Sequence, residues 1–331
     1  MSLAPRVKAN NKERDGAQFA VDGVLVVDKP TGLTSHQVVQ QVKRMFGAAK
    51  AGHSGTLDPS ATGVLVVLIN GATKLAPFLA EQEKTYRFKL YFGVETDTQD
   101  SSGRVVARLP CEPFQEREIK EACAAFIGEI VQTVPRYSAV RVGGQRLYRL
   151  ARRGVEVTPP SRKVQVKKLT FCELNWPEAM FEVTCSKGTY IRSLGVDLAR
   201  RLGCNGHISQ LRRLCSDGFD LKQAVTLKHL EEMVGEAELN QALITPAQAL
   251  TGYPAAKVSH PDAKRVRQGG TLDSAQFLGP GPGQSWTSGP IKVLDPDDNL
   301  VAIVSKTAEA ANDGQHGEII FKTLRVFRPV S

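Results

Sequence analysis

Residues 50–67 read KAGHSGTLDPSATGVLVV and join a loop of small and polar residues to an apolar run. The twelve residues from Gly52 to Gly63 contain three glycines, two serines, two threonines, one histidine and one Asp-Pro pair. The run that follows, up to Ile69, has the length and the β-branched composition of a buried strand. The stretch therefore predicts a tight polar loop at the start of a core strand.

Upstream of this loop the sequence predicts one strand and one helix. The apolar run GVLVVDKP ends at Pro30, which cannot continue a sheet ladder. Thr34 and Gln37 have the spacing of a capping box. Apolar residues follow at helical spacing, and Gly47 stands where a C-cap belongs. The loop thus connects a helix to a strand.

Downstream of the loop, strands and helices alternate irregularly. Every second residue from Tyr86 to Val94 is apolar or aromatic, which predicts a strand with one buried face. The further expected elements are a helix that ends at Gly128, a strand pair over 164–174 and 180–186, and a helix from Ile191 to Gly203. Because no strict βαβ order is present, we expect an α+β fold with a mixed sheet.

The chain of 331 residues is long enough for two domains. We expect a flexible basic tail over residues 1–20, a main body over 21–248 and a small β-rich domain over 249–331. The last part contains a Gly/Pro loop at 278–284 and three short apolar runs, IKVLD, LVAIVS and IIFKTLRVF, which predict strands.

The net charge of +9 is concentrated in one segment. Residues 136–168 contain ten Lys or Arg and a single acid, Glu156, with Tyr137 and Tyr148 between them. Cations that alternate with aromatic rings suit a surface that binds phosphates and bases, so nucleic acid is the expected partner class. The alternative is a solvated basic face without a ligand.

The composition also bears on where in the cell the protein works and on the state of its cysteines. No apolar run approaches the roughly 20 residues that cross a bilayer, and we expect a cytoplasmic protein with no membrane partner. The six cysteines lack C-x-x-C spacing, which argues against a structural zinc site, and we expect them to be reduced and buried. The chain has no unexplained apolar stripe, so we expect a monomer.

Several known active-site motifs are absent from the opening loop. The sequence contains no G-x-x-x-x-G-K-[ST], no G-x-S-x-G and no H-x-E with P-C-x-x-C, which excludes a P-loop, a nucleophile elbow and a zinc deaminase. It contains no metal-ligand cluster and no dinucleotide fingerprint. The remaining chemical group is Asp58, although Asp-Pro is also a common start of a simple turn.

Arg192, Tyr86 and Tyr190 can support chemistry at Asp58, and His53 lies near it in sequence. Arg192 begins a helix and could hold the Asp58 carboxylate bidentately, keeping it ionised. Tyr86 and Tyr190 could stack on a flipped base, while their alternative role is that of ordinary core aromatics. His53 lies in the same loop and is more commonly a hydrogen-bonding residue than a catalyst.

Five segments together resemble the bacterial TruB family of tRNA pseudouridine synthases. They are GVLVVDKPTGLTSHQVVQQVKR, KAGHSGTLDPSATGVLVV, KTYRFKLYFGVETDTQDSSG, VPRYSAVRVGGQRLYRLARRGVEV and CSKGTYIRSLGVDLARRLGCNGHISQLRR, within about Val21 to Phe219. The tail from Tyr253 is similar to a PUA-type RNA-binding domain through GPIKVLDPDDNLVAIVS. The resemblance implies a pseudouridine synthase catalytic body with a mixed sheet, followed by a PUA-like domain.

The resemblance also implies an activity, which is the isomerisation of the uridine at tRNA position 55, in the T loop, without metal or organic cofactor. Asp58 matches the catalytic aspartate and Arg192 the arginine that pairs with it. Tyr86 matches the aromatic residue that stacks on the flipped base, and His53 the histidine that replaces that base in the T loop. Lys29 matches a family motif that packs beside the site, and Tyr190 supports it. We expect Lys29, Tyr190 and, from the basic segment, Arg141, Arg149, Arg152 and Arg153 to bind the substrate.

Other functions remain open on the sequence. A related branch modifies RNA with guide RNAs inside ribonucleoproteins, but the continuous 134–157 segment resembles the stand-alone form that grips tRNA. A tRNA chaperone without chemistry would not need an acid where a polyanion approaches, and a nucleoside hydrolase would not need the basic segment. Three chemical paths are compatible with the sequence: attack at the sugar, attack at the base, or proton abstraction to a glycal. No DNA partner is expected.

Overall fold

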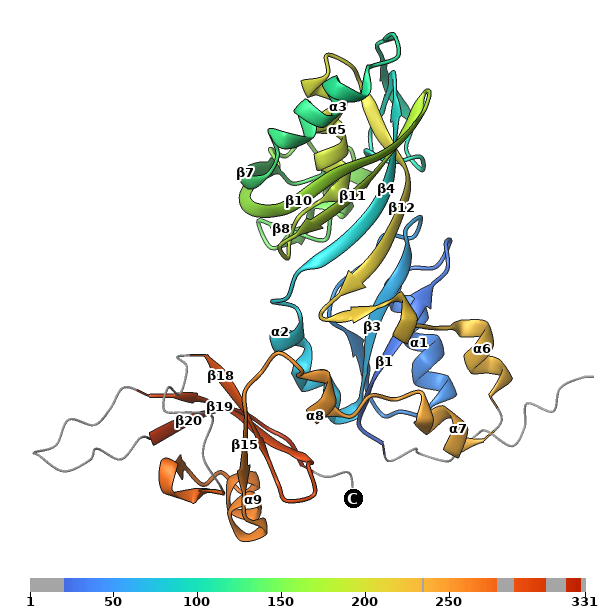
Figure 1. The fold of residues 1–331 in the computed structure, drawn as a ribbon. Helices are drawn as coiled ribbons and strands as arrows, with labels where there is room; N and C mark the ends of the chain where they lie inside the picture. Colours follow the sequence, from blue (N-terminus) through green and yellow to red (C-terminus); the bar gives the residue numbers. More distant parts are fainter. Residues whose placement is uncertain (1–20, 234, 279–288, 308–319, 329–331) are drawn as a thin grey trace, which may run out of the picture.

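The computed structural model describes residues 21–233, 235–278, 289–307 and 320–328 (Figure 1). The basic tail expected at 1–20 and all but the first residue of the Gly/Pro loop at 278–284 lie outside the described residues. The described chain forms a long twisted main sheet with helices against it and a smaller second sheet near the C-terminal end (Figure 1).

The main sheet has ten strands, with eight in the order β14-β1-β3-β12-β4-β11-β10-β7. Their bounds are β1 Gly23–Lys29, β3 Thr62–Ile69, β4 Lys84–Phe92, β7 Gly128–Thr133, β10 Ser161–Asn175, β11 Glu178–Cys185, β12 Gly206–Ser216 and β14 Val225–Thr226. The short strands β2 (Ala51–His53) and β13 (Phe219–Asp220) pair with β3 and β12. β3 is antiparallel to β1 and parallel to β12, so the predicted mixed sheet is confirmed.

The helix ahead of the Asp58 loop forms as predicted. Helix α1 (Ser35–Met45) is capped by Thr34, whose hydroxyl accepts the Gln37 N–H while the Gln37 side chain accepts the Thr34 N–H. Gly47 follows the helix with φ +51°, a left-handed conformation that glycine adopts without a Cβ clash. Local sequence signals were therefore sufficient to define both ends of α1.

The remaining helices lie on the sheet and in its connections. Those of the main body are α2 (Ala76–Leu79), α3 (Glu116–Ala124), α4 (Leu147–Arg152), α5 (Ile191–Arg201), α6 (Leu227–Glu232), α7 (Glu236–Gln241) and α8 (Pro246–Ala249), with 3₁₀ turns η1 (Asn70–Leu75) and η2 (Leu221–Gln223). Helix α5 agrees with the predicted helix from Ile191 to Gly203. The helix expected to end at Gly128 instead ends at Ala124, because Gly128, at φ +112°, begins β7.

Strand β12 was not predicted, although it lies at the centre of the main sheet. It pairs with β4 along most of its length and with β3 only through Arg212–Thr62 and Arg213–Gly63. β4 and β12 curve together from one half of the molecule to the other (Figure 1). The Asp58 loop ends where β3 meets β12, so this junction positions the site.

Strands β1 and β3 bury both of their faces. Leu25, Val27 and Leu65 belong to one core cluster, which α1 and α6 help to form, and the alternate residues Val24 and Val64 belong to another. This explains why both strands read as continuous apolar runs. The apolar side chains of β1 and β3 thus contribute to two hydrophobic cores, one on each face of these strands.

The C-terminal sheet has six strands in the order β16-β20-β19-β18-β15-β17. Their bounds are β15 Ala255–Val258, β16 Leu272–Asp273, β17 Phe277–Leu278, β18 Pro290–Leu294, β19 Leu300–Lys306 and β20 Ile320–Val326, with 3₁₀ turn η3 (Ser274–Gln276) between β16 and β17. Helix α9 (His260–Arg267), which was not predicted, packs against β19. The three predicted strands are confirmed as β18, β19 and β20, in a β-rich arrangement consistent with a PUA-like domain.

The cysteine prediction is wrong in part. Cys111 and Cys204 form a disulfide across 93 residues of sequence, and Cys172 is exposed. Neither fact is visible in sequence spacing, because the fold alone brings Cys111 next to the end of α5. Among the described helices, none combines the length and the hydropathy that a membrane span requires.

Candidate active site

The loop that carries Asp58 is held by hydrogen bonds on both sides of the acid. The Ser35 hydroxyl donates to the Leu57 carbonyl at 2.9 Å and accepts the Leu57 N–H at 2.8 Å. Beyond the acid, the Pro59 carbonyl accepts the Gly32 N–H at 2.9 Å, and the Asp58 carbonyl accepts the Ala61 N–H at 3.1 Å. The backbone of this loop is therefore already fixed, and it needs little rearrangement when a ligand binds.

Lys29, the last residue of β1, stabilises the same loop through hydrogen bonds. Its side chain is fully buried, and its ammonium donates to the carbonyls of Leu33 at 2.6 Å, Pro30 at 3.0 Å and Pro59 at 3.2 Å. Burial lowers the pKa of Lys29 from 10.5 to about 8, against the opposing attraction of Asp58. An RNA ligand could contact this ammonium only if one of these bonds broke.

Arg192 pairs with Asp58, as the sequence analysis expected. Its Nε lies 2.9 Å from Oδ2 of Asp58, with the arginine side chain 5% exposed and the aspartate side chain 36% exposed. The expected bidentate contact is wrong, because Nη1 donates to the Thr98 carbonyl at 2.8 Å and Nη2 to the Tyr137 carbonyl at 3.0 Å. These carbonyls fix the guanidinium, and within the described part of the chain Arg192 binds only Oδ2 of the Asp58 carboxylate.

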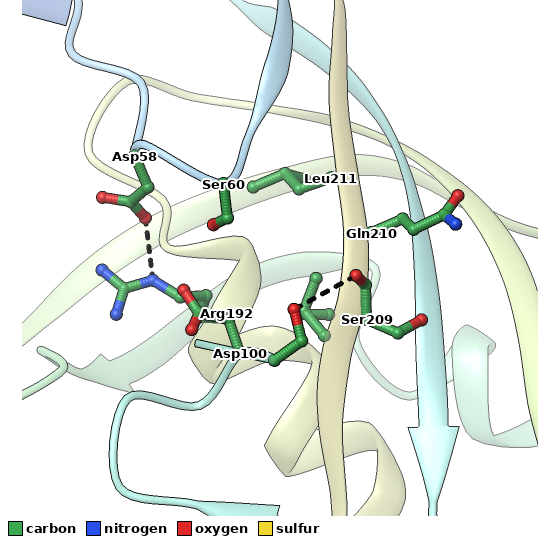
Figure 2. Close-up of a pocket in the computed structure, with 9 residues that line it drawn as sticks. Asp58, Ser60, Asp100, Arg192, Ser209, Gln210 and Leu211 are labelled. Carbon is green, nitrogen blue, oxygen red and sulfur yellow. Dashed lines mark hydrogen bonds and ion pairs between the residues drawn. The ribbon is translucent and has the colours of Figure 1, made fainter. Parts of the chain in front are cut away.

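A pocket opens beside this pair (Figure 2). Figure 2 shows the Asp58 carboxylate directed at the Arg192 guanidinium, with Ser60 and Leu211 across from them. The lining residues are Asp58, Ser60, Asp100, Ser101, Arg192, Ile208, Ser209, Gln210 and Leu211. One wall therefore belongs to β12, and a partly exposed carboxylate lies opposite it.

Asp100 is a pocket residue that sequence reasoning missed. It is buried, and its Oδ1 accepts hydrogen bonds from the Thr98 hydroxyl and from the backbone and hydroxyl of Ser102. These bonds shape the turn in which Gln99 has φ +64°. The turn presents the Thr98 carbonyl to Arg192. The segment TDTQDSSG contributed to the family resemblance, but it was given no role of its own.

Tyr86 lies on β4, opposite Arg213 of β12 and Val183 of β11. Its side chain is buried, and burial raises the pKa of its hydroxyl while the nearby Arg213 opposes that shift. Tyr86 is not among the residues that line the pocket. Its expected stacking on a base stays a prediction.

His53 and Tyr190 flank the site from two elements. His53 ends β2, and its buried Nδ1 has no hydrogen-bond partner among the described residues. Burial lowers the pKa of its imidazole, which favours the neutral form. The Gln132 side chain binds both the N–H and the carbonyl of Tyr190, while Arg162 covers the Tyr190 ring at 4.5 Å. Contacts of His53 and Tyr190 with substrate stay predictions.

The arginines that we expected to bind RNA lie in the segment that contains β8, β9 and α4. Arg141 is on strand β8 (Arg141–Val142), which pairs with β9 (Gln145–Arg146), Arg149 and Arg152 are on α4, and Arg153 follows that helix. All four arginines are exposed. The segment joins the site through Tyr137, whose carbonyl binds Arg192. Phosphate contact by these arginines stays a prediction.

Comparisons with known proteins agree on one family. Residues 43–191 match the TruB family pseudouridylate synthase N-terminal domain, and residues 192–250 match the tRNA pseudouridylate synthase B C-terminal domain. The tRNA pseudouridine synthase B of Syntrophobacter fumaroxidans is 42% identical over 85% of this chain and 92% of its own length. The enzyme of the same name from Syntrophotalea carbinolica is 43% identical over 75% and 81%.

A solved structure has a similar fold. In a Cbf5-Nop10-Gar1 complex, a chain with 25% sequence identity superposes with a TM-score of 0.70. The superposition covers 94% of this chain and 86% of the other. The coverage extends beyond residue 250, where the two family matches end, so the similarity of fold includes the C-terminal sheet.

Proposed function

The chain belongs to the TruB family of pseudouridylate synthases, and we propose that it converts the uridine at position 55 of the tRNA T loop to pseudouridine. The family and the relatives named tRNA pseudouridine synthase B support an RNA-modifying isomerase. The exposed arginines near α4 support a tRNA substrate, because a cluster of exposed cations attracts a folded polyanion.

The observation that carries this proposal is the Asp58–Arg192 pair at the wall of the pocket. In the isomerisation the N1–C1′ bond breaks, a C5–C1′ bond forms, the proton on C5 leaves and N1 gains a proton. The balance needs no oxidant, reductant or co-reactant, so we propose a reaction without cofactor. An ionised carboxylate that is fixed on one side and open on the other suits attack at the substrate or stabilisation of positive charge on its sugar.

The other residues are proposed to prepare the substrate. A uridine inside a folded T loop must leave its stack before Asp58 can reach it. We assign Tyr86 to stack on the flipped base and His53 to take its place in the loop. Tyr190 and Lys29 hold the surroundings of Asp58, and Arg141, Arg149, Arg152 and Arg153 bind the tRNA backbone.

The proposal extends to the domains. Residues 21–248 act as the catalytic domain, and residues 249–331 act as a PUA-like RNA-binding domain. The protein works as a monomer in the cytoplasm, where its tRNA substrate is present. The second of the two family matches ends at residue 250, which supports this boundary.

Tritium release tests the function directly. A tRNA transcript labelled at uridine C5 is incubated with the wild-type protein or with Asp58→Asn in the presence of a chelator. We expect release by the wild type and none by the variant, because Asn keeps the volume of Asp58 but removes its charge and its nucleophile. tRNA binding by Asp58→Asn should stay within about threefold of the wild-type Kd, since an uncharged side chain does not repel phosphate.

Two outcomes would contradict the assignment. Substantial release by Asp58→Asn would remove Asp58 from the mechanism. Tight tRNA binding without any release by the wild type would favour a tRNA chaperone over a synthase.

A further inference from the structure

Arg213 is a buried cation that none of the proposed roles uses. Its side chain is 1% exposed, although it belongs to β12 at the centre of the main sheet. Its Nε donates to the Val64 carbonyl at 2.7 Å, Nη2 to the Gly55 carbonyl at 3.1 Å and Nη1 to the Thr56 carbonyl at 3.4 Å. One guanidinium therefore ties the chain before Asp58 to the strand after it.

The backbone of Arg213 contacts the same loop. Gly63, at φ +100°, pairs with Arg213, and a Cβ at residue 63 would lie 2.1 Å from the Arg213 carbonyl oxygen. Only glycine allows this approach. The end of the loop is consequently fixed to β12 by both the side chain and the main chain of Arg213.

Arg213 also contacts Tyr86. The two residues are opposite each other in the β4–β12 pairing, and the Arg213 guanidinium is close enough to the Tyr86 hydroxyl to oppose the rise of its pKa. Tyr86 cannot reach the loop through the pairing of its own strand, because β12 lies between β4 and β3. Arg213 belongs to β12 and therefore lies next to both Tyr86 on β4 and the loop that leads into β3.

The start of the loop has a second anchor at the end of β12. The Ser54 hydroxyl donates to the Asp217 carboxylate, and Asp217 forms a buried ion pair with Lys84 at 2.9 Å. Lys84 begins β4, two residues before Tyr86. The loop and the Tyr86 strand thus share two sets of buried contacts, both built on β12.

We propose that Arg213 is a positioning residue that fixes the Asp58 loop and Tyr86 relative to each other. This inference rests on the proposed function, because it assigns Asp58 and Tyr86 to one reaction. Arg213 does not line the pocket and acts through the two groups that it holds. The planar guanidinium of an arginine directs its N–H donors at several acceptors at once, whereas the single ammonium of a lysine cannot reach all three carbonyls.

Arg213→Lys tests the role, with Arg212→Lys as the matched control. Arg212 is the preceding residue of β12, and its fork binds Asp28 through Nη2–Oδ2 at 2.7 Å and Nη1–Oδ1 at 3.1 Å, without contact to residues 54–59. Both variants retain the positive charge. We expect Arg213→Lys to lower the single-turnover rate of tritium release by about 10- to 100-fold, since small misplacements have effects of this size. The tRNA Kd and the rate of Arg212→Lys should stay within about threefold of wild type.

A second readout separates positioning from a loss of folded protein. In the Arg213→Lys background, Tyr86→Phe should reduce the rate by a smaller factor than it does in the wild-type background. The hydroxyl that Phe lacks is the group of Tyr86 on which the Arg213 charge acts, so the two effects should not multiply. Rates are measured on protein whose folded fraction is verified by circular dichroism.

The outcomes are distinct. No release by the wild type would overturn the proposed function itself. With the wild type active, equal rates for Arg213→Lys and Arg212→Lys, or fully multiplicative effects with Tyr86→Phe, would overturn the role of Arg213. Arg213→Gln is the second variant if Arg213→Lys is unfolded. If neither folds while Arg212→Lys does, Arg213 serves folding and the positioning role is rejected.

Discussion

At the scale of single residues, the site is built from buried cations around one open carboxylate. Lys29, Lys84, Arg192 and Arg213 are all nearly or fully buried. A buried cation is costly unless its protons are satisfied, and here they are satisfied by backbone carbonyls and by the carboxylates of Asp58 and Asp217. These satisfied cations hold the backbone around Asp58 in place.

The pKa of Lys29 leads to a prediction about stability. The folded protein releases this proton near pH 8, while the unfolded chain holds it up to about 10.5. Between these values the unfolded state binds more protons, so the free energy of unfolding gains a contribution that rises with pH. Urea unfolding at pH 7 and pH 10 should therefore show the wild type gaining stability relative to Lys29→Met as pH increases.

Lys50→Met controls for the loss of an exposed ammonium in that experiment. If the difference between wild type and Lys29→Met stays level or falls as pH increases, the pKa of Lys29 is not depressed.

At the scale of elements, β12 supplies most of the framework of the site. It lines the pocket through Ile208, Ser209, Gln210 and Leu211, and it holds the loop through Arg213. Its pairing with β4 is irregular between Ile208 and Gln210 and again between Arg213 and Cys215. Such bulges change the direction of side chains along a strand, which lets one strand serve both the pocket and the loop.

Helix α4 and the residue after it carry three exposed arginines, which we propose to contact the tRNA backbone. Replacement of Arg149, Arg152 and Arg153 by Ala should weaken tRNA binding and lower the slope of log Kd against log salt by roughly one per lost phosphate contact. The single-turnover rate at saturating enzyme should change much less, because none of these arginines lines the pocket. Filter binding across a salt series measures the slope.

The control for α4 removes an equal charge elsewhere. Arg117, Lys120 and Lys228 are exposed on α3 and α6, and their replacement by Ala should leave the slope close to that of wild type. Equal slopes for the two triple variants would mean that α4 does not touch phosphate.

At the scale of the whole molecule, the two sheets share a hydrophobic core. Val24, Val64 and Leu68 of the main sheet belong to one cluster with Ile303 and Phe327 of the C-terminal part. Polar contacts add to it, since Lys74 donates to the Val326 carbonyl and Tyr253 to the Phe78 carbonyl, each at 2.9 Å. An RNA that touches both parts would thus meet one surface of fixed shape.

This shared core predicts cooperative unfolding. Calorimetry of the wild type should show a single transition, because unfolding of the C-terminal part exposes the apolar side chains of β1 and β3. Phe327→Ala should lower the stability by about 3 kcal/mol, the usual minimum for a buried phenylalanine, and should split the transition in two. Phe321→Ala, within the separate C-terminal core, lowers stability without affecting the shared contacts. Two transitions in the wild type would contradict the coupling.

The sequence by itself determined the elements whose signals are local. Strand β1, helix α1 with its Thr34 cap, strand β3 and helix α5 follow from apolar periodicity and capping residues. The motifs around Asp58 and Arg192 indicated the family, and the expected pairing of these two residues is present.

Tertiary structure alone decided the contacts that depend on distant partners. Strand β12 escaped prediction because its sequence, GHISQLRRLCS, places charged residues where a central strand is normally apolar. Arg213 can be buried there only because carbonyls of the Asp58 loop accept its protons, and that loop precedes it by more than a hundred residues. The single Arg192–Asp58 contact, the Asp100 turn and the Cys111–Cys204 disulfide are of the same kind. The spacing of apolar residues within a segment shows which of its faces is buried. The hydrogen-bond partners of buried polar groups come from distant segments, so they are decided only when the chain folds.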